Sequence, residues 1–536
     1  MESREPLREA PAPSQLAAPM IDDKSPSDSA QNSAFVPVLR AWLSRMPAER
    51  AVFWTALCVA TLVVSTRIAL EVSKHVFSAW SSFRLGFSAQ LTAGIDLYPA
   101  LGTGPVIGNI YGPFAAVFYL PALLAPSPTL QVLAAQLYTV ACVGGLLIVA
   151  CVLRARHGVS STGCVALVGL AVMLALPGLR HCLIQIHADA PCVVLGVLSC
   201  LVWRGAPRFE LKRSALSALL WALAALSKQH ALFVLVAHCL LLWRWFGLRN
   251  ALLHGVLASS ALVAGFYTIA FAIGSQPSAI WFNTITVPAS HPLRLRREWL
   301  ALSRFVALVP PLLAFWCATW CMSLASSGPR REVRDVRDVA MLVAASLALV
   351  PVALLSGMKE GGYLNNYHAQ YYALLAACLT ATDALSRSSA VNARTSRIAL
   401  ASVTLASVLL VPSDLEDELP GFKEVLLHLD ASPHERAAAY LREHNDAYFP
   451  WHTLESAQQL RGAYHSFDGL RTLKLAGREL SQGAFAKFTP QSPRYIVMPN
   501  EGRGIPPTLK TINRYYRDYH NVTPPPELDG FLVYSR

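Results

Sequence analysis

The sequence predicts a mainly α-helical, polytopic transmembrane bundle of about eleven crossings, followed by a small α/β domain. Composition is the first reason: the 536 residues are 54% hydrophobic and 15% charged, with a mean hydropathy of +0.40, which is too apolar for a soluble protein of this length. Apolar runs long enough to cross, or nearly cross, about 30 Å of hydrocarbon recur up to residue 412. After that residue, charged residues become frequent.

Residues 1–45 are expected to form a disordered tail on the cytoplasmic side. They are rich in Pro, Ser and Ala and lack the apolar core of a signal peptide. The net charge of +12 raises the alternative of nucleic-acid binding. Lys and Arg are, however, distributed in short clusters between the apolar runs, which favours a membrane topology with positive loops in the cytoplasm and no nucleic-acid partner.

The transmembrane module is expected over residues 46–412. Its candidate crossings lie at 51–70, 129–153, 161–177, 187–203, 214–227, 231–246, 251–273, 301–323, 339–356, 367–384 and 397–412. The basic clusters of the connectors then fall on one side, which identifies that side as the cytoplasm. The outward connectors are 71–128, 178–186, 228–230, 274–300, 357–366 and everything after 412. Eleven crossings place the C-terminus outside the cytoplasm.

The first outward connector, 71–128, is expected to be a working loop at the membrane surface. Residues 71–93 carry apolar side chains at helical spacing, which predicts an amphipathic helix lying along the bilayer. The run 111–126 contains three prolines and is expected to form a short interfacial helix that does not cross. Glycines and prolines between Tyr98 and Tyr111 predict turns that can cradle a ligand, with these two tyrosines as candidate contacts.

Residues 413–536 are expected to form a small extracytoplasmic α/β domain. The stretch 433–444 has apolar residues at helical spacing beneath a polar face, and 513–520 is a second candidate helix. The segments 494–499 and 530–536 are short apolar runs typical of buried strands. The pattern does not define the order of the strands.

Four basic or imidazole side chains crowd the connector 274–300, on the side where positive charge is normally avoided. They are His291, Arg294, Arg296 and Arg297. Guanidinium groups bind phosphate oxygens through paired hydrogen bonds, so a phosphate or pyrophosphate at the level of the lipid headgroups is the natural ligand. The alternative is a cluster that contacts lipid headgroups without binding a substrate.

A second candidate site involves Lys228, which lies between two short apolar runs. Burying its charge in hydrocarbon costs about 2.5–3.5 kcal/mol, so we expect Lys228 to face a wet cavity and to pair with Asp189 or with a ligand phosphate. Asp189 precedes Pro191 by two residues, which predicts that its carboxylate caps a helix. Its neighbour His187 is a candidate proton carrier or hydroxyl binder. The alternative is a structural cap and turn without substrate contact.

Amide and phenol side chains gather in the connector 357–366, immediately before the next apolar run. They suit a hydroxyl-rich ligand, with Asn366 as the candidate contact, although Asn366 could equally cap the helix that follows. The eleven cysteines lie mostly within apolar runs, and nothing in their spacing indicates disulfides or a zinc site.

Four local patterns, in their order along the chain, resemble the multipass glycosyltransferases of the GT-C superfamily, which include the protein O-mannosyltransferases and the aminoarabinose transferase of lipid A. The patterns are GIDLY followed by YGPFAAVFYLP, then HADAPCVVLGVL, ALAALSKQHAL and GYLNNYHAQYYAL, within about residues 50–385. The resemblance implies a GT-C-type bundle. It also implies an enzyme that moves a sugar from a polyprenyl-phosphate carrier to a hydroxyl acceptor, a glycan, lipid or protein, at the outer face of the membrane.

The resemblance further implies roles for individual residues. Asp189 matches the acid that begins a helix in the family, and Lys228 matches the Lys of a TK(G/Q) pattern. Residues 291–297 match a loop that, together with that Lys, helps to hold the carrier phosphate in relatives. The family's catalytic carboxylate precedes the GIDLY-like pattern, but this chain has FSAWSS in that neighbourhood.

Glu71 is therefore the nearest upstream candidate for a general base, and Asp96 is the downstream candidate. A base of this kind would deprotonate the acceptor hydroxyl and the reaction would invert the anomeric carbon. No cofactor is certain on this basis. A divalent cation could assist, but no ligand spacing requires one.

Two other classes of protein stay open on the sequence alone. Intramembrane Asp, Lys and His residues also mark the substrate or proton path of a secondary transporter. The two halves of the chain show no correspondence, however, and the Gly- and Pro-rich loop after the first apolar run favours a lipid-facing enzyme. The third class is a non-enzymatic membrane scaffold that displays its C-terminal domain.

Overall fold

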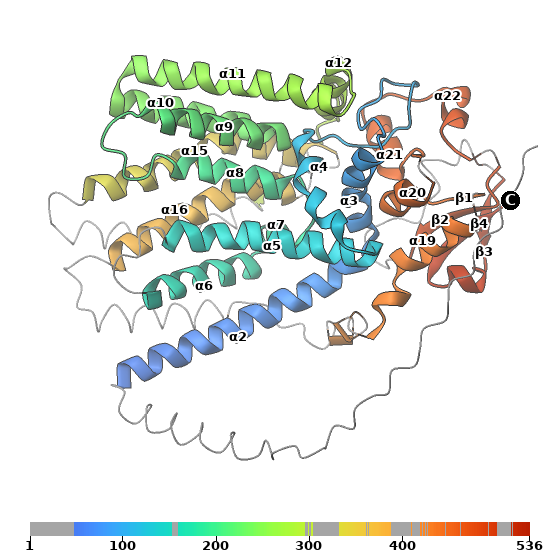
Figure 1. Cartoon of the computed structure of the whole chain (residues 1–536), viewed down its shortest axis with the longest axis horizontal. Helices are drawn as coiled ribbons and strands as arrows, with labels where there is room; N and C mark the ends of the chain where they lie inside the picture. The colour runs from blue at the N-terminus through green and yellow to red at the C-terminus, as the bar shows by residue number, and fades with distance from the viewer. Residues whose placement is uncertain are drawn as a thin grey trace, which may run out of the picture. The chain divides into compact units, whose positions relative to one another are not determined.

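A computed structural model of the chain shows a helical bundle followed by a small mixed sheet (Figure 1). The structure describes residues 48–152, 159–294, 332–360, 364–386, 427–444, 446–460, 462–490, 492–500 and 518–536, with a few isolated residues between these ranges. Val52–Arg536 form one compact unit. The tail predicted over residues 1–45 lies outside the described residues.

Every predicted crossing that falls on described residues is a helix. In chain order these helices are α2 (Ala48–Val76), α5 (Pro128–Val152), α6 (Val159–Ala175), α8 (Asp189–Leu201), α9 (Leu211–Ser227), α10 (Val234–Phe246), α11 (Leu248–Ala272), α15 (Glu332–Met358) and α16 (His368–Ser386). The expected crossings 301–323 and 397–412 lie almost entirely outside the described residues. The predicted mainly α, polytopic fold is confirmed.

The described chain holds five helical stretches that are long and apolar enough to span a membrane. They are Arg50–Val76, Pro128–Leu147, Gln229–Phe246, Leu248–Ala272 and Val339–Met358. Helix α16 is apolar on all sides, and its side chains are buried without interruption from His368 to Thr380. A helix of that composition belongs in the interior of a bundle, and Tyr372 fixes it there by donating to the Val143 carbonyl at 2.5 Å.

Short helical segments connect the long helices at the end of the bundle that carries the outward connectors. They are α3 (Ala79–Thr92), α4 (Phe114–Phe118), η1 (Leu120–Leu124), α7 (Pro177–Ile184), η2 (Gln229–Phe233), α12 (Pro277–Trp281), η3 (Phe282–Thr286), α13 (Val287–Ala289) and η4 (Leu364–Tyr367). The run 111–126 forms α4 and η1, so it does not make a spanning helix, as expected.

The single helix predicted over 71–93 is divided in two, which corrects the sequence-based expectation. Helix α2 continues to Val76, and Ser78 begins a new helix because its hydroxyl accepts the Trp80 N–H at 3.3 Å. The apolar face of α3 packs on protein. The ring of Phe83 lies 5.9 Å from that of Trp451, which belongs to the C-terminal domain.

The C-terminal domain contains a four-stranded sheet in the order β1-β2-β4-β3, formed by β1 (Ala447–Tyr448), β2 (Tyr495–Pro499), β4 (Phe531–Ser535) and β3 (His520–Val522). Strand β1 is parallel to β2, whereas β4 is antiparallel to both β2 and β3. The helical segments are η5 (Leu429–Ala431), α19 (Pro433–Glu443), α20 (Thr453–Leu460), α21 (Phe467–Leu475), α22 (Gln482–Lys487) and η7 (Pro526–Leu528). The two predicted strands and the helix predicted over 433–444 are confirmed. The helix predicted over 513–520 is wrong at its described residues, because 516, 518 and 519 are not helical and His520 begins β3.

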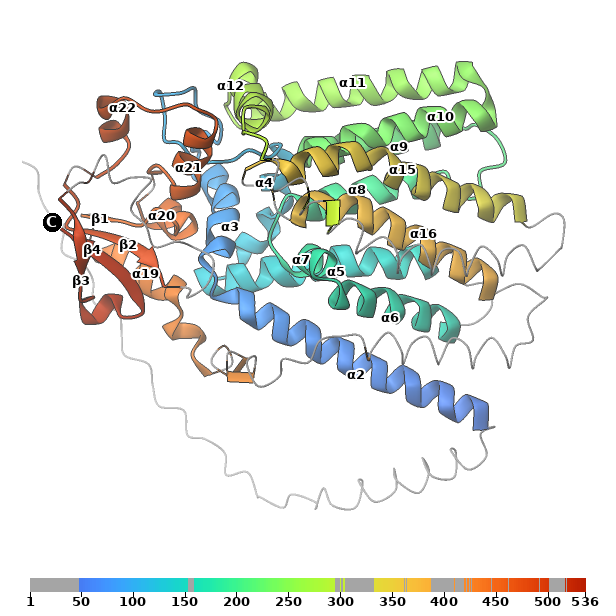
Figure 2. The same cartoon turned by 180° about the vertical axis from the view of Figure 1, so that it is seen from behind.

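Helix α20 joins this domain to the first loop, and Figures 1 and 2 both show it beside α3. The Thr453 hydroxyl donates to the Phe83 carbonyl at 2.9 Å, and the Ser82 hydroxyl lies 2.5 Å from a Glu455 carboxylate oxygen. Gly86 permits this approach, because a Cβ atom at that position would lie 2.8 Å from the backbone nitrogen of Leu454. The C-terminal domain is therefore docked on α3 by packing and by buried hydrogen bonds.

Candidate active site

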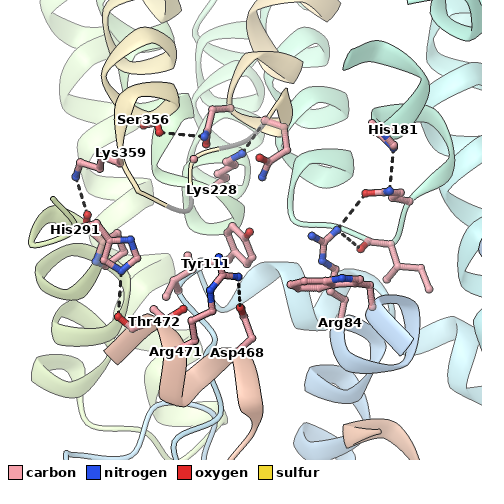
Figure 3. Close-up of a pocket in the computed structure, with 18 of the residues that line it drawn as sticks. Arg84, Tyr111, His181, Lys228, His291, Ser356, Lys359, Asp468, Arg471 and Thr472 are labelled. Carbon is pink, nitrogen blue, oxygen red and sulfur yellow. Dashed lines mark hydrogen bonds and ion pairs between the residues drawn. The ribbon is translucent and has the colours of Figure 1, made fainter. Parts of the chain in front are cut away.

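A cavity of about 830 Å³ lies where the connectors predicted to face outward meet the C-terminal domain (Figure 3). Every connector predicted to face outward contributes to its wall. Among the lining residues are Arg84, Tyr111, Gln185, Lys228, His291, Asn365 and Asp468. A cavity of this volume is typical of small-molecule and cofactor sites.

A buried charged cluster lies at the wall of this cavity, where α8 begins. Lys228 Nζ donates to Asp189 Oδ1 at 2.5 Å and to the Asn365 carbonyl at 3.1 Å. Both charged side chains are almost fully buried, with Lys228 3% and Asp189 1% exposed. The second carboxylate oxygen of Asp189 contacts His187 Nδ1 and, at 3.2 Å, His368 Nδ1. Lys228 also lines the cavity, so this cluster forms part of the cavity wall.

Asp189 does not cap its helix, and in this respect the sequence-based expectation is wrong. The N-cap of α8 is Ala188, and no side chain accepts a hydrogen bond at that position. A missing cap costs about 0.5–2 kcal/mol, whereas a buried charge without its partner costs about 3–5 kcal/mol. The Asp189 carboxylate therefore serves Lys228.

Tyr111 connects the cavity to the charged cluster. Its hydroxyl lies 2.8 Å from His187 Nε2, and the Asn365 side-chain amide donates to the same nitrogen at 3.3 Å. Burial raises the pKa of Tyr111 above its usual range, so the phenol stays protonated and can donate a hydrogen bond to His187. Nδ1 of the same imidazole accepts the backbone N–H of Asp189 at 3.3 Å and contacts its carboxylate. A hydrogen-bonded path therefore runs from the cavity through Tyr111 and His187 to Asp189.

Tyr98 supports this path from behind. Its hydroxyl donates to the Tyr111 carbonyl at 2.6 Å and accepts the Asn109 amide at 2.8 Å, and its side chain is fully buried. Tyr98 thus positions Tyr111 and is not among the residues that line the cavity. Asn366 does line it, and its amide donates to the Ser356 carbonyl at 3.2 Å.

The basic connector contributes one of its predicted residues to the cavity wall. His291 lines the cavity, and its Nε2 donates to the Thr472 carbonyl of α21 at 3.2 Å. Arg294 Nη2 pairs with Glu360 Oε2 at 2.7 Å, and its side chain is 60% exposed. Arg296 and Arg297 lie outside the described residues.

Neither carboxylate predicted as the general base lines the cavity. Glu71 lies inside α2, where its Oε1 pairs with Arg67 at 2.9 Å and with Arg180 at 3.1 Å. Asp96 lies in the turn after α3, where its carboxylate accepts the Tyr98 N–H at 2.9 Å and the Ser275 hydroxyl. Both carboxylates are occupied in holding chain segments together. The assignment of either as the base stays a prediction.

Several cavity residues carry charge but were not predicted as ligands. The Arg84 guanidinium donates to the Ile186 carbonyl at 3.3 Å and lies 5.4 Å from the centre of the Trp80 ring. Lys359 Nζ donates to the Pro288 carbonyl at 2.6 Å. Asp468 and Arg471 come from α21 and line the opposite part of the wall. Arg84 belongs to α3, whereas Asp468 and Arg471 belong to α21, and neither of these helices carries a sequence motif that identifies them as ligands. The polar face of α3 was the available signal for Arg84.

A group of buried side chains near the docked face of α20 has the geometry of a metal site. The ligand atoms of His434, His452 and Glu455 all lie within 4.8 Å of one another. His434 Nε2 donates to the Val76 carbonyl at 2.9 Å, which leaves Nδ1 to face Glu455 at 2.7 Å. His452 Nδ1 lies 3.5 Å from Glu455 Oε1, and its Nε2 is buried without a hydrogen-bond partner among the described residues. Although burial opposes ionisation, His452 and His434 hold the pKa of the Glu455 carboxyl well below its usual range.

The bundle, its long first loop and the appended α/β domain have the fold of ArnT, which is the kind of fold that the resemblance in the sequence implied. In particular, the chain is similar to the crystal structure of ArnT from Cupriavidus metallidurans bound to undecaprenyl phosphate. The sequence identity is 16% and the TM-score 0.50, and the match covers 89% of this chain and 97% of that one. The apo structure of the same ArnT gives 15% identity, a TM-score of 0.49 and coverages of 90% and 98%. No protein-family model and no curated protein matches the sequence.

Proposed function

We propose that this protein is a membrane glycosyltransferase that takes a sugar from a polyprenyl-phosphate carrier and transfers it to a hydroxyl group of an acceptor. The observation that carries the proposal is the charge of the cavity. Five Lys and Arg side chains line it, Lys74, Arg84, Lys228, Lys359 and Arg471, against the two carboxylates Glu360 and Asp468. Such an excess of positive charge, enclosed beside apolar helices, suits an anionic headgroup on a lipid tail. The similar fold of ArnT bound to undecaprenyl phosphate supports this choice of ligand.

In this proposal Lys228 and the neighbouring cations hold the carrier phosphate. The sugar leaves as the bond between its anomeric carbon and the phosphate oxygen breaks, and the negative charge that develops on phosphate is stabilised by the fixed cations. A single displacement inverts the anomeric carbon. The amides of Asn365 and Asn366 and the phenol of Tyr111 lie in the same wall and suit the hydroxyl groups of a sugar.

We further propose that the cavity opens on the extracytoplasmic side. The connectors that converge on it are those that the distribution of Lys and Arg assigns to the outer face. The basic clusters at 204–213 and 244–249 contribute no lining residue. In this orientation the described C-terminal domain lies outside the cytoplasm.

Reconstituted protein tests the proposal. The purified full chain, in proteoliposomes that contain a radiolabelled sugar linked to polyprenyl phosphate, is expected to move the label to an added acceptor and to release the carrier phosphate. Uptake of a free solute without transfer would identify a transporter instead. A protein that neither transfers nor transports would be a scaffold, and either result overturns the proposal.

The His434, His452 and Glu455 group is proposed to hold one divalent cation, for which zinc is the natural choice because two imidazoles and a carboxylate are common zinc ligands. The site lies between the end of α2 and the C-terminal domain, so the cation would stabilise the docked domain. A ligand at one hundred times its Kd adds about 2.7 kcal/mol of stability.

The purified protein is therefore expected to contain about one equivalent of zinc by elemental analysis. The His452→Ala variant should lack the metal and unfold at a lower temperature, and a chelator should lower the Tm of the unmodified protein to a similar extent. His520→Ala, which changes an exposed histidine of the same domain, is the control. A metal-free protein whose Tm does not respond to added zinc would contradict the prediction.

A further inference from the structure

Two carboxylates line the cavity among the described residues, and they differ in how they are held. Glu360 accepts two hydrogen bonds from one guanidinium group, because Arg294 Nε and Nη2 lie 2.9 and 2.7 Å from its Oε2. Asp468 has a looser contact, since the nearest nitrogen of Arg471 lies 3.9 Å from its Oδ1, beyond hydrogen-bond distance. Of the two, Asp468 is held less tightly by its arginine, so its carboxylate can more readily turn to a ligand.

The position of Asp468 is fixed by the start of α21. Ser466 caps this helix, since its hydroxyl accepts the Gly469 N–H at 3.0 Å and donates to the Ile107 carbonyl at 2.6 Å. The residue before it, His465, accepts the Val106 N–H through Nδ1 at 2.7 Å. These contacts attach the first turn of α21 to the same loop that carries Tyr111.

The backbones approach so closely at this point that side chains do not fit between them. Gly108 has a φ of +83°, and a Cβ atom there would lie 2.6 Å from the Cα of Gly469. At the other end of α21, the Thr472 carbonyl accepts a hydrogen bond from His291. Asp468 therefore sits on a helix that is held at both ends against elements of the cavity wall.

The chemistry of the cavity differs between the two sides of Tyr111. Figure 3 shows Lys228 on one side of the Tyr111 ring and Asp468 on the other. Burial raises the pKa of the Asp468 carboxyl above its usual range, against the opposing effect of Arg471 and Arg84. A carboxylate with a raised pKa, on the other side of Tyr111 from Lys228, has the position and the basicity of a proton acceptor.

We propose that Asp468 is the general base that deprotonates the acceptor hydroxyl, an inference that rests on the proposed glycosyltransferase function. The hydroxyl proton passes to the Asp468 carboxylate as the acceptor oxygen forms a bond to the anomeric carbon. The bond from that carbon to the phosphate oxygen breaks, and its electron pair leaves with the polyprenyl phosphate. The C-terminal domain is then a part of the active site as well as an appendage of the bundle.

The test compares Asp468→Asn with Asp529→Asn, which changes an exposed carboxylate of the same domain. Transfer by Asp468→Asn is expected to fall about 10²- to 10⁴-fold in kcat/KM, the usual contribution of a general base. Its Kd for polyprenyl phosphate should remain within about twofold of the wild-type value, because the carrier site lies on the other side of Tyr111. Asp529→Asn should match the wild type in both measurements.

The pH profile separates a catalytic role from a structural one. For a base with a raised pKa, transfer by the wild type falls as the pH drops through that pKa, because the carboxylate becomes protonated. Asp468→Glu should keep this acidic limb at a shifted pH, whereas the residual activity of Asp468→Asn should lack it. The transfer rates of these variants are compared with that of the wild type. A wild type that transfers no sugar would therefore overturn the proposed function and would not bear on the role of Asp468.

Two results would overturn the assignment of Asp468. One is a folded Asp468→Asn variant with wild-type transfer. The other combines two observations: Asp468→Asn loses carrier binding together with transfer, and Asp468→Glu shows the same pH profile as the wild type. This combination would make Asp468 a structural residue of the cavity wall.

Discussion

Replacement of Lys228 by Met is expected to lower sugar transfer strongly and to weaken the binding of the polyprenyl-phosphate carrier. Lys228 lines the cavity, and its ammonium group is held in place by its hydrogen bond to the Asp189 carboxylate. The loss of one fixed charge that stabilises the departing phosphate should lower transfer by about 10²- to 10³-fold. The measurement is transfer of labelled sugar in proteoliposomes, together with the Kd for polyprenyl phosphate.

The same substitution removes one partner of a buried ion pair. Asp189 would keep its charge at a position that is 1% exposed, so the free energy of unfolding is expected to fall by about 3–5 kcal/mol. The double variant Lys228→Met/Asp189→Asn is the control, because it removes both charges. It should recover much of the lost Tm and none of the lost transfer. Wild-type transfer in either variant would exclude Lys228 from phosphate binding.

Replacement of Glu71 by Gln is expected to destabilise the protein strongly and to leave transfer by the folded fraction within about tenfold of the wild-type rate. Glu71 is 2% exposed and its Oε1 is shared by Arg67 and Arg180. Without the carboxylate, two cations lie close together in the bundle with less counter-charge, which should lower the free energy of unfolding by about 3–5 kcal/mol.

The double variant Glu71→Gln/Arg180→Gln distinguishes this structural role from catalysis. Removing one cation along with the carboxylate should restore part of the Tm that the single variant loses. If Glu71→Gln instead folds normally, binds polyprenyl phosphate and transfers no sugar, the base assignment that the family resemblance suggested would be supported. Carrier binding therefore has to be measured in both variants.

The fold was largely predictable because each of its determinants is local. A run such as 251–273 is apolar for long enough to span hydrocarbon, and this requires no knowledge of its neighbours. The two-part helix at 71–93 shows the limit of such reasoning, because a single serine hydroxyl at Ser78 interrupts a continuous amphipathic pattern.

The site was predictable where two residues lie at the ends of helices that must share one side of the membrane. This condition identified Asp189 and Lys228 as candidate partners, and their atoms lie 2.5 Å apart. Distance along the chain indicated Glu71 as a candidate base but could not show that its carboxylate is buried between Arg67 and Arg180. Asp468 and the His434 group could not have been assigned from the sequence, since they are brought to their positions by the docking of a domain whose topology the sequence leaves open.

The contact between Gly108 and Gly469 has a consequence for protein engineering. Because the two backbones leave no room for a side chain on either glycine, the loop and the C-terminal domain have to be compatible at this point. A chimaera that takes this domain from another protein of the fold should therefore also take the matching segment around residues 106–109. Grafting the domain alone would leave one wall of the cavity in the wrong register.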